Sequence, residues 1–174
     1  MKLALKKIIV VLTLFFINFN LNADVPSYVD FKYILNQSTA GKKAQSFLKN
    51  KLEQGLKKLS EQEKNILKEE KQIIEQKKLI KPDEYKNKVD SLRTKVLNLQ
   101  KERDRLLKSV SEQRQIARNE LLKNLNPIIS EYMQEKKIRM VVDKKSILLA
   151  DQNLDITKQI IELLNKKLKS IKLN

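Results

Sequence analysis

The side chains that most often carry out chemistry in proteins are scarce in this chain. It has no Cys and no His among 174 residues, which excludes the usual zinc sites and nucleophile–imidazole pairs. One stretch, Gly41-Lys42-Lys43, is similar to part of a phosphate-binding loop. That loop needs a Gly five positions earlier and Ser or Thr after the first Lys, and here those positions hold Asn36 and Lys43. We therefore interpret Gly41 as a helix-start residue, and we expect no cofactor, no metal and no enzymatic activity.

Charge is the second chemical property that stands out. Lys and Arg number 37 against 21 Asp and Glu, a formal net charge of +16. Residues 40–137 alone hold 25 basic and 15 acidic residues. Such a surface attracts anionic partners, such as nucleic acid or anionic lipid. Because exposed charges are screened over about 8 Å at physiological salt, this attraction acts at short range.

The N-terminal segment is typical of a secretory signal peptide. Three lysines, at positions 2, 6 and 7, precede an apolar run from Ile8 to Phe19, and the small residue Ala23 follows. The run is shorter than the roughly 20 residues that span a bilayer. We predict that residues 1–23 are a signal peptide cleaved near Ala23, so that the mature chain begins at Asp24 with a net charge three units lower, +13. The alternative is an uncleaved membrane anchor.

A heptad pattern predicts a first long helix from Ala40 to Ile80, capped by Ser38 or Thr39. Pro82 suits the first turn of a second helix, and the acidic residues 83 and 84 suit its positive end. The first helix repeats an apolar residue every seven positions: Leu52, Leu59, Ile66, Ile73 and Ile80, with Leu48 and Leu56 in an intermediate row.

The second helix carries two matching rows, and Arg103 interrupts one of them. Folding the chain near Lys81 places residues whose numbers add up to about 162 opposite one another, so that both rows meet the first helix in one antiparallel register. At about 1.5 Å per residue, the resulting arm, residues 40–126 with its tip near 80–83, would be roughly 60 Å long. The two rows are Tyr85, Leu92, Leu99 and Leu106, and Val89, Val96, Val110 and Ala117; the expected facing pairs are Ile73–Val89, Ile66–Val96, Leu56–Leu106 and Leu52–Val110.

Both ends of the chain show strand-like patterns. Residues 24–31 read as an edge strand followed by a helical turn over 31–35, and residues 138–142 and 147–150 read as two further strands. We expect Pro127 to kink the second helix, and Asp155 to cap a last amphipathic helix. The chain is thus predicted to be α+β but mostly α: a discontinuous body, residues 24–39 plus 127–174, into which the helical hairpin is inserted.

Three short strands leave exposed edges, which favour pairing with another chain. The predicted oligomerisation residues are Tyr28, Val29, Ile138, Met140, Val141, Val142, Ile147, Leu148 and Leu149.

The chain resembles the Skp/OmpH-like family of periplasmic outer-membrane-protein chaperones over nearly its whole predicted mature length. The most specific part is the C-terminal order Asn126-Pro127-Ile128-Ile129, then Ile138-Arg139-Met140-Val141-Val142-Asp143, then Asp155-Ile156-Thr157. Many members carry Gly before the second strand, whereas Lys136-Lys137 stand here, which puts the geometry of that turn in question.

The resemblance implies a homotrimer in the periplasm, with a shared β-barrel-like body and helical arms around a cavity. It implies an ATP-independent holdase that keeps unfolded outer-membrane proteins from aggregating, and an anionic lipid or lipopolysaccharide surface as a further partner. The candidate client contacts lie off the heptad rows or near the tip: Phe47, Leu67, Ile74, Leu79, Ile80, Tyr85, Leu97, Leu107, Lys77, Lys78, Lys81, Lys86 and Lys88. Pro127 is the candidate hinge.

Three questions stay open at this level. A third helix could cover the off-row apolar residues, or they could form an exposed adhesive surface. The basic charge also fits a nucleic-acid-binding coiled coil, although no binding motif is present and export would argue against nucleic acid as a partner. An uncleaved anchor would instead make the protein a membrane-tethered envelope component.

Overall fold

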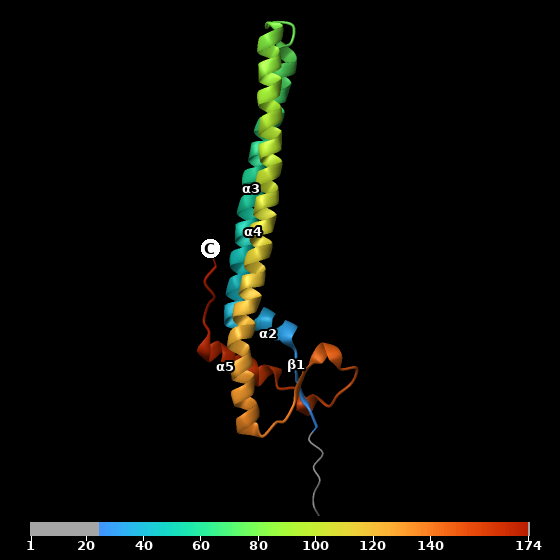
Figure 1. Ribbon diagram of the computed structural model, residues 1–174, viewed down its shortest axis with the longest axis vertical. Coiled ribbons are helices and arrows are strands. Elements are labelled where there is room, and N and C mark those ends of the chain that lie inside the picture. The colour runs from blue at the N-terminus through green and yellow to red at the C-terminus, as the bar shows by residue number, and fades with distance from the viewer. Residues whose placement is uncertain (1–24, 174) are drawn as a thin grey trace, which may run out of the picture.

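The computed structural model describes residues 25–173, so the predicted signal peptide and its cleavage site lie outside the described residues. Two long helices lie side by side as a hairpin, and the strands, α2 and α5 gather at its base (Figure 1). The predicted fold class, mostly helical with a small β part and a long hairpin arm, is confirmed. The elements are β1 (Ser27–Val29), α2 (Phe31–Gln37), α3 (Thr39–Gln76), α4 (Pro82–Lys136), β2 (Val141–Asp143), two 3-10 turns (Lys144–Ser146 and Gln152–Leu154) and α5 (Thr157–Lys167).

The start of α3 is a tight corner after α2. Ser38 is fully buried, and its hydroxyl accepts a 3.2 Å hydrogen bond from the Gly41 N–H, as expected of an N-cap. A Cβ on Gly41 would lie 1.9 Å from the carbonyl oxygen of Leu35. Only a residue without a side chain therefore lets α2 fold back this closely on α3, which gives Gly41 a more demanding role than the predicted helix start.

The tip of the hairpin differs from the prediction in where the first helix stops. The N–H groups of Leu79 and Ile80 both donate to the carbonyl of Gln76, which closes a turn after the helix has ended. The predicted continuation to Ile80 is therefore wrong by four residues. Lys81 is extended, as expected for a residue before proline, and Pro82 occupies the first turn of α4, with acidic residues 83 and 84 at its positive end.

The antiparallel register agrees with the prediction. Lys95 bonds to Glu69 at 2.6 Å, and Lys88 donates to Gln76 at 2.8 Å; the residue numbers in each pair add up to 164, close to the predicted 162. The predicted facing pair Leu56–Leu106 needs correction, because a Cβ on Gly55 would lie 2.5 Å from a methyl group of Leu106. Leu106 thus packs over the glycine, and Leu56 turns toward solvent.

The last turns of α4 pass through Pro127 without a break, because the helix continues to Lys136. It ends when Lys137 takes a left-handed conformation, φ 56°, and the Ile138 N–H reaches back to the Met133 carbonyl at 2.8 Å. This is the helix ending that Gly usually makes. The unusual Lys136-Lys137 pair thus keeps the turn geometry at the cost of a strained residue.

The strands are shorter and fewer than predicted. Ile138 closes the helix instead of opening a strand, so β2 spans only Val141–Asp143 and pairs in parallel with β1. The predicted strand at 147–150 is wrong. In this chain β1 lies between β2 and a bridge to Asp155, and no neighbouring strand offers hydrogen bonds to residues 147–150 within residues 25–173. The predicted three-stranded sheet is therefore two-stranded.

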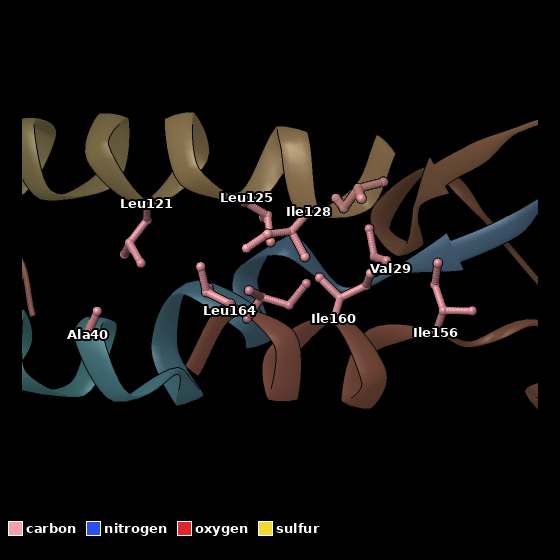
Figure 2. Close-up of a cluster of buried hydrophobic side chains, with 10 residues drawn as sticks. Val29, Ala40, Leu121, Leu125, Ile128, Ile156, Ile160 and Leu164 are labelled. Atoms are coloured by element: carbon pink, nitrogen blue, oxygen red, sulfur yellow. The ribbon is translucent and has the colours of Figure 1, made fainter. Parts of the chain in front are cut away.

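The hydrophobic core lies at the base of the hairpin, where both ends of the chain meet. Figure 2 shows Leu125 and Ile128 of α4 facing Ile160 and Leu164 of α5, with Val29 of β1 beside them. These five side chains are at most 2% exposed. Ala40, Leu121 and Leu125 also belong to this cluster, so helices assigned to the arm continue into the core.

Two hydrogen bonds tie α5 and its start to the N-terminal segment. The Asp30 N–H donates to Thr157 Oγ1 at 2.9 Å, and the Thr39 N–H donates to Asn165 Oδ1 at 2.7 Å. Asp155 accepts from the Thr157 N–H at 2.9 Å, although the capping position itself is one residue later, at Ile156. The base of the arm is thus held by segments more than 120 residues apart.

Candidate binding surface

The off-row apolar residues of the arm are exposed in this chain. Phe47, Leu67 and Leu107 are about half exposed, and Ile74 and Leu97 rise to about 60%. No helix within residues 25–173 covers them, because α5 packs at the base of α4. The sequence left open whether a third helix covers these residues or whether they form an exposed surface. In the single chain they form an exposed surface.

Sequence reasoning missed three further exposed apolar residues on the arm. Leu56 and Val96 belong to heptad rows that were expected to be buried, yet both are more than 40% exposed, and Ile116 is half exposed. Ile116 precedes Ala117 by one residue, and its position beside the row could have indicated its exposure. Leu56 stands eight residues after Leu48 instead of seven, and this offset could have indicated its exposure. No sequence signal distinguished Val96 from its buried row partners.

The tip combines apolar and basic side chains. Leu79 is 83% exposed, whereas Ile80 and Tyr85 are half-buried. Lys77 lies over the Tyr85 ring at 5.8 Å, a cation–π contact that holds its positive charge beside an aromatic side chain. The tip therefore offers an apolar contact next to a positive field.

The remaining tip lysines differ in their partners. Lys88 is engaged by Glu84 at 3.4 Å and by Gln76. Lys78, Lys81 and Lys86 are exposed and make no ion pair with any described residue. These three are the lysines that remain available to an anionic partner.

A polar groove runs along one flank of the arm. It is lined by residues of both helices, among them Asn65 and Glu69 of α3 and Lys95 and Asn98 of α4. A second, more apolar hollow lies nearer the base, between Phe47, Gly55 and Leu106. Both hollows are open and shallow. Neither gathers the convergent donors of a catalytic centre, and no group of His, Cys, Asp or Glu that could hold a metal ion occurs within residues 25–173.

The predicted oligomerisation residues divide into two groups. Tyr28 and Val29 are buried, and Ile138, Val141, Val142 and Ile147 are partly buried. Met140 is 56% exposed, and Leu148 and Leu149 are almost fully exposed, at 103% and 91%. The adjacent Leu148 and Leu149 project into solvent from a loop and form an exposed apolar patch.

One ammonium group at the base has a shifted pKa. Lys136 bonds to the neighbouring Glu135 carboxylate at 2.8 Å, and this hydrogen bond and its charge raise the pKa of Lys136 above its ordinary value. The group lies at the C-terminal end of α4, away from the tip lysines.

Comparisons with known proteins agree with this architecture. The family model for outer membrane protein (OmpH-like) matches residues 27–164. The chain belongs to the OmpH-like family. A crystal structure from Caulobacter crescentus, solved as a candidate outer membrane chaperone (OmpH-like), superposes with a TM-score of 0.79 at 22% identity, covering 86% of this chain and 90% of that one. That likeness shows the shared fold. A search of curated proteins finds no match, and no helix in residues 25–173 is long and apolar enough to cross a membrane.

Proposed function

We propose that this OmpH-like protein is an ATP-independent holdase chaperone that retains unfolded outer-membrane proteins in the periplasm and prevents their aggregation. The observation that carries this proposal is the long arm, on which apolar side chains are exposed along its length between charged ones. Half-exposed apolar residues without a partner in the chain provide weak, distributed contacts for a partner that lacks fixed shape. Family membership supports the same role.

The charge of the arm supports an electrostatic contribution to binding. Basic residues outnumber acidic ones by ten over residues 40–137, and three of the lysines that make no ion pair with a described residue lie at the tip. Since exposed charges are screened at short range, we expect capture of a client to weaken as the salt concentration rises. Anionic lipid or lipopolysaccharide is a second expected partner of this basic surface.

The body supports a proposed homotrimer. The two-stranded sheet leaves a strand edge that pairs with no other strand within residues 25–173, and Leu148 and Leu149 are uncovered in the single chain. Three arms around a shared body would enclose a cavity, as the family resemblance implies. Native mass spectrometry of the purified protein tests this proposal; a monomer at micromolar concentration would contradict it.

Light scattering tests the holdase proposal directly. A urea-denatured outer-membrane β-barrel protein is diluted into buffer with and without a several-fold excess of this protein, with no nucleotide present. We expect scattering to fall strongly, and less so at higher salt. An unrelated basic protein of similar net charge serves as the control for charge alone. Unchanged aggregation at several-fold excess would reject the proposed function.

Location is tested separately. Cell fractionation is expected to recover the protein with periplasmic markers, and mass spectrometry of its N-terminus is expected to begin at Asp24. A cytoplasmic mature protein would instead favour the nucleic-acid-binding alternative, and an intact N-terminus in the membrane fraction would favour the envelope tether.

A further inference from the structure

We propose that one flank of the arm, and not the other, is the surface on which an unfolded polypeptide docks. This flank, here called the leucine flank, consists of Leu56, Leu67 and Ile74 of α3 and Leu97 and Leu107 of α4. The inference rests on the proposed holdase function, which it makes specific by naming the side of the arm that contacts the client.

The exposed leucines of the two helices are level with one another. In the observed register, facing residues have numbers that add up to about 164, as in the Glu69–Lys95 ion pair. Leu67 is therefore level with Leu97, and Leu56 with Leu107. The hairpin thus carries two pairs of exposed leucines, separated along the axis by eleven residues of α3, or about 16 Å.

These pairs also lie on the same flank. Every member directly follows a residue at a heptad position of the helix–helix seam: Leu67 follows Ile66, Leu97 follows Val96, which is itself 48% exposed, and the other three follow Gly55, Ile73 and Leu106. In an antiparallel pair of helices, residues at equivalent heptad positions share a flank. The residues that directly precede the seam confirm this geometry, because Asn65 and Lys95, one from each helix, line the same polar groove. The leucine flank is therefore the side opposite that groove.

A row of lysines borders the leucine flank. Three lysines of α3, Lys57, Lys64 and Lys71, recur every seven residues, and Lys78 continues the spacing just beyond the end of the helix. All four are exposed, and none makes an ion pair with a described residue. Leu67 lies between Lys64 and Lys71 at helical spacings of three and four residues, which place side chains on one face. Three acidic residues of this flank are engaged in ion pairs: Glu53 with Lys49, Glu63 with Arg103 and Asp90 with Arg93.

This combination identifies the chemistry of the occupant. A second copy of the same flank would bring lysine rows together and would meet apolar residues only every seven to eleven positions, too sparse for a helix–helix seam. An extended, unfolded chain can place apolar side chains on separated leucine pairs and acidic side chains on the lysines between them. We therefore assign the flank to an unfolded polypeptide that carries apolar and acidic residues.

Two matched double variants test the assignment. L67Q/L97Q removes one level pair from the leucine flank. F47Q/I116Q removes a pair that is equally level and similarly exposed, but both of its members directly precede the seam and so lie on the groove flank. Since all four side chains are exposed, circular dichroism is expected to show unchanged helix content for both variants.

The readout is the dissociation constant for a fluorescently labelled, urea-denatured outer-membrane β-barrel protein, measured at low salt with the full protein. We expect roughly tenfold weaker binding for L67Q/L97Q, the change that corresponds to about 1.4 kcal/mol, and less than twofold weaker binding for F47Q/I116Q. A photoreactive residue in place of Leu97 is expected to cross-link to the labelled probe.

The outcomes separate this inference from the proposed function. If the wild-type protein does not bind the probe, both are rejected. If the wild-type protein binds and L67Q/L97Q binds equally well, or F47Q/I116Q weakens binding as much, the flank assignment alone is overturned. Cross-linking from position 97 to a second copy of the chain, in place of the probe, overturns it as well.

Discussion

Replacing either of the two glycines with Ala applies the same chemical change at two points of one helix, with opposite expected results. In an unstrained helix interior, Gly→Ala stabilises by about 1 kcal/mol. At Gly41 the added methyl group would lie 1.9 Å from the Leu35 carbonyl oxygen and 2.9 Å from Ser38 Oγ. At Gly55 it would lie 2.5 Å from the end of the Leu106 side chain.

The atoms that the added methyl group would meet decide how much each substitution changes the free energy of unfolding. Contacts of Cβ below 3.0 Å are essentially never observed, so the Leu35 carbonyl would have to move by about 1 Å, shifting α2 against the buried Ser38. Overpacking of this kind costs about 1–3 kcal/mol or more, and here backbone must move. We expect G41A to lower the free energy of unfolding by at least about 2 kcal/mol after the propensity gain. Leu106 borders an open hollow and can rotate away, so G55A should stay within about 1 kcal/mol of wild type.

Urea denaturation followed by circular dichroism measures both variants, at one fixed protein concentration because an oligomer's stability depends on it. The expected order of midpoints is G41A well below wild type, and G55A equal to or above it. A G41A protein as stable as wild type, or less destabilised than G55A, would refute the close approach of α2 to α3.

Three further predictions concern the base of the arm. N165A should lower the free energy of unfolding by about 1–2 kcal/mol, because the Thr39 N–H loses its acceptor. N165D keeps an acceptor beside the positive end of α3 and should melt near wild type. Equal loss of stability in both variants would contradict this role of Asn165. K137G should raise the free energy of unfolding by about 0.5–1 kcal/mol, since Gly adopts the left-handed conformation without a Cβ penalty. K137V should lower it. A melting temperature of K137G at or below that of K137V would be inconsistent with the left-handed helix ending. L148S/L149S should leave helix content unchanged but reduce the native mass if these exposed leucines are covered by a partner chain, and an unaltered mass would exclude them from the assembly.

The helical arm was predictable because its signals are local and repeated. Five apolar residues at seven-residue spacing, from Leu52 to Ile80, specify a helix face that must meet a partner. Pro82 marks the bend, because its ring fixes the backbone and it has no N–H to donate. The register followed because only one antiparallel alignment brings both apolar rows together. The hydroxyl of Ser38 likewise specified the start of α3 within one turn.

The strands and the exposure of individual row residues were not predictable in the same way. Ile147-Leu148-Leu149-Ala150 has strand-like composition, yet a strand exists only where a neighbour supplies hydrogen bonds, and β1 is already flanked by β2 and Asp155. Ile138 fits a strand by type, but the helix ending uses its N–H. Such outcomes depend on which distant segment is adjacent.

By itself, the amino-acid sequence determined the hairpin, its bend, its facing rows and the absence of His and Cys chemistry, because each depends on residue type and short-range spacing. The tertiary structure alone decided that Gly41 admits α2 at the corner, that Gly55 receives Leu106 and frees Leu56, and that no described segment covers the off-row leucines of the arm. These are distances between segments far apart in the chain, and no local pattern encodes them.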